Sequence, residues 1–192
     1  FIGQKILEFE TTGKGTYLFG MEESYGCLPG TYARDKDAVV AVMALCEAAA
    51  YYKEKGLTLW DQMLKIYEKY GYYKETLVSI TMKGVDGAEK IQKILSDMRA
   101  NPPKEIGTHK VLAVRDYDAD TRLDMETGKV TETGLPKSNV LYYELDRDAW
   151  CCVRPSGTEP KVKFYMGVKE DSIAHAEAAL ESLKDAMTEL VK

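Results

Sequence analysis

The sequence predicts an α+β C-terminal domain, built on a mainly antiparallel sheet with two helices on one face, preceded by an incomplete α/β piece. Strand-like runs at 140–145, 149–153 and 162–168 follow one another through short connections, which favours antiparallel pairing. Helical periodicity flanks these runs, as in a sheet covered by helices. The first 70 residues instead hold two long helices with too little sheet to cover them.

The N-terminal part is expected to start with two short strands and to continue with two helices. Turn residues separate the strand-like runs, and residues that favour helix caps precede both helical stretches. The predicted elements are strands at 5–10 and 16–19, a helix at 36–55 capped by Asp35, and a second helix that begins at Thr58, with Asp61 as a near-match to a capping box, and stops at Gly71.

The pattern changes at Gly71, from long helices to clustered strands. We therefore expect two domains, 1–70 and 71–192, the second with four or five strands. Its predicted elements are strands at 73–83 and 110–117, a helix at 86–99, a polar loop at 118–138, the three strands given above and a helix at 171–190.

Composition and charge indicate a soluble protein with a core and exclude several classes. Of 192 residues 45% are hydrophobic, and the net charge of −5 argues against a nucleic-acid partner. The longest apolar stretch, 38–50, is too short to span a membrane. Four cysteines without a C-x-x-C pattern predict reduced thiols and a cytoplasmic location. Because the chain starts at Phe1 without Met, we expect a piece of a longer protein.

The loop from Arg154 to Lys161 concentrates groups that bind anions. The Arg154 guanidinium can hold a phosphate or carboxylate through two hydrogen bonds, and Ser156 and Thr158 can each donate one more. Gly157 lets backbone N–H groups approach an anion closely. These residues predict a phosphate cradle, and the alternative is a polar hairpin loop with solvated charges.

Two stretches together resemble the α-D-phosphohexomutase family. One is Glu22-Glu-Ser-Tyr-Gly26, followed by Arg34-Asp-Lys-Asp37, and the other is Arg154-Pro-Ser-Gly-Thr-Glu-Pro-Lys161. The resemblance implies that 1–70 is the C-terminal part of the family's third, sugar-binding domain and that 71–192 is its fourth, phosphate-binding domain. It is strongest for the long-chain branch of phosphoglucomutases and phosphopentomutases, where Ser24 favours a glucose phosphate.

The resemblance implies an isomerase of carbohydrate metabolism, a phosphoprotein and intramolecular phosphotransferase. Such phosphoglucomutases and phosphomannomutases interconvert hexose 1-phosphate and 6-phosphate through a bisphosphorylated sugar and a phosphoserine. The implied substrate-binding residues are Glu22 and Ser24 for the sugar hydroxyls, and Arg154, Ser156, Gly157, Thr158 and Lys161 for the phosphate that does not react. Lys36 would neutralise phosphate charge or assist proton transfer. An ordinary acidic turn is the alternative for Glu22.

The resemblance also implies partners and cofactors outside this chain. They are a hexose phosphate substrate, the N-terminal domains of the same protein, Mg²⁺ bound by those domains, and an activator of the glucose 1,6-bisphosphate type. Neither the reactive-serine loop nor the Mg²⁺ loop of the family occurs here, so the isolated chain is expected to be inactive. A phosphopentomutase and a non-catalytic module that binds sugar phosphates remain alternatives.

One acidic run resembles a metal-binding motif. Asp116-Tyr-Asp-Ala-Asp-Thr-Arg122 resembles the opening of a calcium loop. However, Thr121 stands where that loop needs Gly, and Thr127 stands where it needs a bidentate Glu. We therefore expect a solvated loop and no metal site in this chain.

Overall fold

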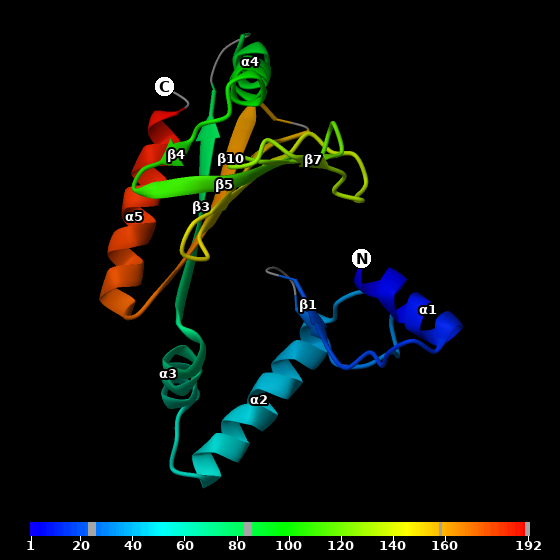
Figure 1. The fold of residues 1–192 in the computed structure, drawn as a ribbon. Helices are drawn as coiled ribbons and strands as arrows, with labels where there is room; N and C mark the ends of the chain where they lie inside the picture. The colour runs from blue at the N-terminus through cyan, green and yellow to red at the C-terminus, as the bar shows by residue number, and fades with distance from the viewer. Residues whose placement is uncertain (23–25, 83–85, 158, 191–192) are drawn as a thin grey trace. The chain divides into compact units, whose positions relative to one another are not determined.

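The computed structural model describes residues 1–22, 26–82, 86–157 and 159–190. The chain forms two compact units, Phe1–Ile66 and Tyr67–Lys192. Helices make up most of the first unit, whereas the second is built on a large sheet (Figure 1). Within the described residues no helix is long and apolar enough to cross a bilayer.

The first unit has little sheet and little core. Among its described residues, only Ile6 and Leu28 are buried hydrophobic side chains. Its longest helix is apolar on all sides, which is typical of a helix surrounded by protein, yet it has no buried residue here. The expected incomplete α/β piece is therefore confirmed. Its elements are α1 (Ile2–Thr12), an antiparallel pair of β1 (Gly20–Met21) with β2 (Cys27–Leu28), α2 (Ala38–Glu54) and α3 (Leu59–Tyr70). The last turn of α3 lies beyond Ile66, where the first unit ends.

The two strands predicted at the N-terminus are wrong. Residues 5–10 belong to α1, which Gly13 ends in the left-handed conformation (φ 65°). Helical spacing is visible in the burial, because Ile6 is fully buried and Phe9, three residues on, is half-buried, whereas Leu7 and Glu8 between them are exposed. The Thr12 hydroxyl also donates to the carbonyl of Glu8, one turn back, at 2.6 Å. The second run, 16–19, is irregular, and strand pairing begins only at Gly20.

Of the two predicted helix caps, the cap of α3 is confirmed and the cap of α2 is wrong. The capping box of α3 is confirmed, since Thr58 Oγ1 accepts from the Asp61 N–H at 3.0 Å and the Asp61 carboxylate accepts from the Thr58 N–H at 2.7 Å. The cap of α2 is Asp37, not Asp35, because Asp37 Oδ1 accepts from two helical N–H groups at 2.8 and 3.3 Å. Helix α2 therefore begins two residues later than predicted.

The second unit is one antiparallel sheet with helices packed against it. Every pairing between its strands is antiparallel, which confirms the predicted fold class. The strand order is β3-β10-β9-β8-β5-β6-β7, with β4 beside β5. The elements are β3 (Tyr72–Thr81), α4 (Gly87–Ala100), β4 (Glu105–Ile106), β5 (His109–Asp116), β6 (Thr121–Asp124), β7 (Val130–Thr131), β8 (Leu141–Leu145), β9 (Trp150–Pro155), β10 (Lys161–Glu170) and α5 (Ile173–Glu189).

Helices α4 and α5 cover one face of this sheet. Helix α5 packs along β3 and β10, and α4 contacts β10 (Figure 1). The core between them consists of alternate strand residues and one side of each helix, including Leu95, Val153, Phe164, Leu183 and Met187, all 0% exposed. The other face, which we call the open face, carries Arg115, Tyr142, Trp150, Cys152 and Tyr165, all half-buried.

The sheet has eight strands, more than the four or five predicted. Three short strands were missed: β4, and the pair β6 and β7 inside the supposed polar loop 118–138. These strands are too short to show an alternating pattern. Strands β4 and β6 pair with β5, and β7 pairs with β6. The Asp124 carboxylate closes the β6–β7 turn by accepting from the Thr127 N–H at 2.8 Å.

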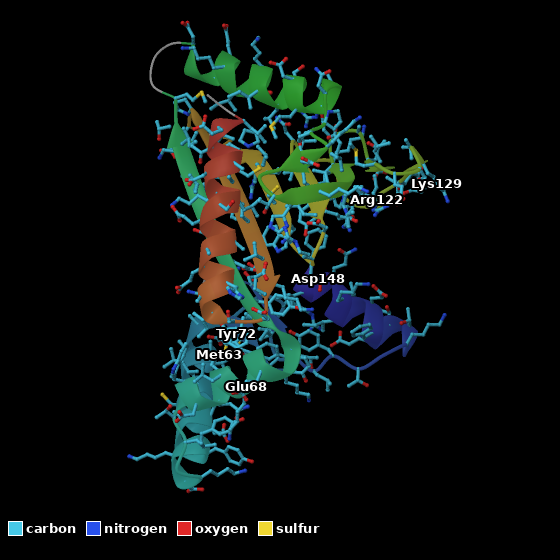
Figure 2. All side chains as sticks on the ribbon, turned by 60° about the vertical axis from the view of Figure 1, so that its left-hand side comes forward. Met63, Glu68, Tyr72, Arg122, Lys129 and Asp148 are labelled. Carbon is cyan, nitrogen blue, oxygen red and sulfur yellow. The ribbon has the colours of Figure 1, made fainter. Side chains whose placement is uncertain are left out.

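The turn between β8 and β9 stores backbone strain that a substitution can relieve. Arg147 and Asp148, labelled at Asp148 in Figure 2, have φ values of 56° and 58°, and the Ala149 N–H donates to the Asp146 carbonyl. Glycine adopts this left-handed conformation without cost. Asp148→Gly and Asp148→Ala both lose the ion pair with Lys169, so they differ in the cost of the left-handed backbone conformation. We expect Asp148→Gly to be about 1 kcal/mol more stable than Asp148→Ala in urea unfolding. Equal stability of the two variants would contradict this.

Candidate functional site

Two strands hold the candidate phosphate-binding loop at its ends. Arg154 and Lys161, predicted as loop residues, lie inside β9 and β10, so the connecting loop spans only 156–160. The ladder continues to the loop, pairing Pro155 with Val162 and Arg154 with Lys163. Paired strands position Arg154 more rigidly than a free loop would, because its backbone lies in the sheet.

The loop backbone is also anchored. The Ser156 N–H donates to the Lys161 carbonyl at 2.8 Å, and the Met82 N–H donates to the Pro160 carbonyl at 2.9 Å. Gly157 is exposed, and no other part of the structure lies within 4 Å of the position a Cβ would take. The space around Gly157 can therefore admit a ligand.

The charged side chains of this region differ in their partners. Arg154 is exposed and forms no ion pair with a described residue. Lys161, in contrast, forms an ion pair with Glu159 at 3.0 Å. Ser156 is half-buried, and Thr158 lies outside the described residues. Of the predicted phosphate-binding cations, Arg154 is thus the one with an unengaged charge among the described parts of the chain.

The candidate sugar-binding loop brings together two predicted residues. Glu22 follows β1, and its Oε2 lies 3.0 Å from Lys36 Nζ. Lys36 also lies 3.2 Å from Asp35 Oδ1. The Lys36 side chain is only 20% exposed, against 44% for Glu22. Ser24, the other predicted sugar contact, lies outside the described residues.

Hydrogen bonds to Glu22 and then to Asp35 raise the pKa of Lys36 above its ordinary value. Lys36 is therefore a cation at neutral pH. It lies before the Asp37 cap and therefore outside the first turn of α2. The close packing explains the glycine at the end of this loop: Gly26 has φ 119°, and a Cβ there would lie 2.8 Å from the Asp37 carbonyl oxygen.

Two aspartates of the acidic run at 116–122 accept hydrogen bonds from other parts of the protein. Asp116 accepts from Arg99 Nε at 2.9 Å, and Asp120 Oδ1 accepts from the N–H groups of Thr133 and Gly134 at 3.1 and 3.0 Å. In the described parts of the chain, no three His, Cys, Asp or Glu residues form a group that could hold a metal ion. The Mg²⁺ that the family resemblance implies would be held by residues outside this chain.

Comparison with known protein families shows to which family the chain belongs. Residues 1–70 match the profile "Phosphoglucomutase/phosphomannomutase, alpha/beta/alpha domain III", and residues 103–185 match the profile of the "Phosphoglucomutase/phosphomannomutase, C-terminal domain". The chain belongs to the phosphoglucomutase/phosphomannomutase family. Both profiles come from one family and occur in the order that the two motifs predicted, so the recognition from sequence is confirmed.

Individual members of the phosphoglucomutase/phosphomannomutase family show how much of a relative this chain covers. A phosphoglucomutase of Staphylococcus aureus (strain MRSA252) is 38% identical over 169 residues, which are 88% of this chain and 30% of that protein. The enzyme of strain N315 is 37% identical over the same lengths. The fold also matches a crystal structure of parafusin, a phosphoglucomutase from Paramecium in its open form, with a TM-score of 0.60 and 17% identity over 97% of this chain and 32% of that one.

The chain therefore spans about 30% of the length of the phosphoglucomutases it matches. One residue near the phosphate loop of this family member was missed from sequence. Lys163 is the cross-strand partner of Arg154. The strands expected at 149–153 and 162–168 would pair Val153 with Val162, whereas the ladder pairs Pro155 with Val162, so the expected register could not bring Lys163 opposite Arg154.

Proposed function

We propose that this chain is the C-terminal part of a phosphoglucomutase that interconverts hexose 1-phosphate and 6-phosphate, and that it supplies sugar recognition and phosphate binding. Its partners would be a hexose phosphate and further domains of the same protein, and its location the cytoplasm, as expected from the sequence. The relatives found are named phosphoglucomutases, which does not favour the phosphopentomutase alternative.

A single observation carries the phosphate-binding role. Arg154 presents an exposed guanidinium without an ion pair to any described residue, directly before a loop that is open at Gly157. An unneutralised guanidinium beside a glycine with open space around it matches the planar, bidentate recognition of phosphate.

Each residue then has a distinct task in the proposed enzyme. Arg154, with donors from Ser156 to Thr158, would hold the phosphate that does not react, whichever way the sugar is turned. Glu22 would accept hydrogen bonds from sugar hydroxyls. Lys36, with its raised pKa, would serve as a fixed cation rather than as a base, since a base needs a lowered pKa to be unprotonated at neutral pH. No step is assigned to a metal on this chain.

The sugar-binding role can be tested by Glu22→Gln in a mutase of full family length that carries this chain. We expect kcat/KM for glucose 1-phosphate to fall by about 10-fold to 100-fold, because a charged acceptor contributes about 1.5–3 kcal/mol per hydrogen bond. Steady-state kinetics with a coupled assay for glucose 6-phosphate would measure this.

Glu8→Gln provides the matched control, since Glu8 is a surface residue of the same unit that pairs only with Lys5 among the described residues. It removes the same charge and should leave kcat/KM unchanged. If the Glu22 and Glu8 variants behave alike, Glu22 does not bind the sugar. If the unaltered enzyme turns over a pentose phosphate faster than glucose 1-phosphate, the phosphopentomutase alternative holds.

A further inference from the structure

Strand β3 forms one edge of the large sheet along its whole length. Among the described residues, its 10 residues pair with β10 on one side and with no strand on the other (Figure 1). The opposite edge is β7, which has only 2 residues. A long edge strand is a template for pairing with another chain, whereas a short one offers few backbone groups. Strand β3 is therefore the edge at which this sheet can be extended.

The hydrogen bonds to β10 show which backbone groups of β3 point to the free side. The Met82 N–H donates to the Pro160 carbonyl at 2.9 Å, and these two residues continue the register that pairs Thr81 with Lys161. In an antiparallel ladder, hydrogen-bonded pairs alternate with pairs that exchange no hydrogen bonds. Even-numbered residues of β3 therefore bond to β10, and odd-numbered ones direct their N–H and C=O groups outwards. The outward residues are Tyr73, Glu75, Leu77, Ser79 and Thr81, whose side chains are also exposed.

Little on this strand prevents pairing with another strand. Proteins block exposed edges with proline, bulges or lysine. Strand β3 has no proline, and its register with β10 runs without a bulge. Its lysine, Lys74, is an even-numbered residue whose side chain is engaged by Glu177 of α5 at 2.6 Å. The remaining charge on the outward residues is that of Glu75.

A second copy of β3 satisfies this edge in one two-fold register. The register centred on Leu77 gives every outward residue an outward partner in the other copy, whereas a shift of the centre by one residue leaves a strand end unpaired. It sets Glu75 opposite Ser79 and Tyr73 opposite Thr81, so no like charges meet. At the centre, two Leu77 side chains, each 49% exposed in the single chain, cover each other.

We propose that β3 is a homodimer interface, at which two copies of this chain join antiparallel and centred on Leu77 into one continuous sheet. A second copy is favoured over an unrelated peptide because the strand is self-complementary in its hydrogen-bonding groups and in its side chains. A two-fold axis perpendicular to the sheet keeps the helix-covered faces of both copies on the same side. The contact uses none of the residues assigned to sugar or phosphate, so it goes beyond the proposed function.

The test is sedimentation velocity of this 192-residue chain from about 10 µM to about 1 mM, because a single strand pair is a small interface and should give a weak dimer. We expect association that rises with concentration. Leu77→Lys should raise the dimer dissociation constant by about tenfold or more, because it sets two like charges directly opposite each other. Leu77→Glu should do the same. An equimolar mixture of these two variants should restore association, since lysine then lies opposite glutamate.

Leu112→Lys is the matched control. Leu112 is 42% exposed on β5, and β10, β9 and β8 lie between β5 and β3 in the sheet. The same replacement there should leave the dimer unchanged. A chain that stays monomeric over the whole range would refute the proposal. Equal association of the Leu77→Lys and Leu112→Lys variants would place the contact on another surface, and a mixture that associates no better than either Leu77 variant alone would exclude the two-fold register.

Discussion

Replacing Arg154 by alanine in a mutase of full family length is expected to lower kcat/KM for glucose 1-phosphate by about 100-fold to 1000-fold. The exposed guanidinium has no ion pair with a described residue and can make two charge-assisted hydrogen bonds to one phosphate. Each such bond contributes about 1.5–3 kcal/mol, and 1.36 kcal/mol corresponds to tenfold in rate. Poor positioning of the substrate adds to the loss, because phosphoryl transfer depends mainly on position and charge.

Arg122→Ala is the control for this variant. Arg122, labelled on β6 in Figure 2, lies on the same sheet, but its guanidinium is already bound by Glu144 through contacts of 2.9 and 2.6 Å. The control should therefore retain nearly full activity. Similar kcat/KM values for the Arg154 and Arg122 variants would show that Arg154 has no special role in the reaction.

The largest effect on stability is expected from Phe164→Ala. Phe164 is fully buried at the centre of β10, the strand that contacts both helices and two neighbouring strands. Its truncation removes apolar burial and leaves a cavity, at a cost of about 3–5 kcal/mol. Most domains have only about 5–15 kcal/mol of stability, so the second unit should become marginal. Urea unfolding followed by circular dichroism measures the change.

Leu77→Ala controls for the loss of a hydrophobic side chain as such. Leu77 lies on the neighbouring strand β3 and is 49% exposed on the open face. Its replacement should cost less than about 1 kcal/mol. If both variants shift the urea midpoint by the same amount, the core does not lie between the sheet and α4 and α5 as described.

The sequence predicted those elements whose apolar pattern extends over many residues. Helix α5 and strands β8 and β10 appear close to their expected positions, because long periodic patterns report which face is buried. The errors concern short elements. The run at 5–10 is short enough to fit a strand or a helix pattern, and the structure buries Ile6 and half-buries Phe9, three residues apart, as in a helix. Strand β6 pairs with β5 and β7 pairs with β6, and no local sequence pattern reveals these partners.

The candidate site was predictable in its residue types but not in its geometry. The motifs pointed to Glu22, Lys36 and Arg154, but only the structure shows that Glu22 and Lys36 lie in contact. It also shows that Lys161, which was expected to add a positive charge, forms an ion pair with Glu159. Lys163, which was not predicted from the sequence, lies opposite Arg154. Such pairings depend on strand register, which the length of a loop determines.

The most direct test of the central claim is an NMR titration of this 192-residue chain with glucose 1-phosphate. The amide signals of Ser156 and Gly157 and the Nε–H signal of Arg154 should shift with about millimolar affinity, since one open loop binds a screened charge weakly. The same sample should show no turnover in the coupled assay. Absence of shifts at Arg154, Ser156 and Gly157, or saturation confined to other residues, would contradict the assignment of phosphate binding to this loop.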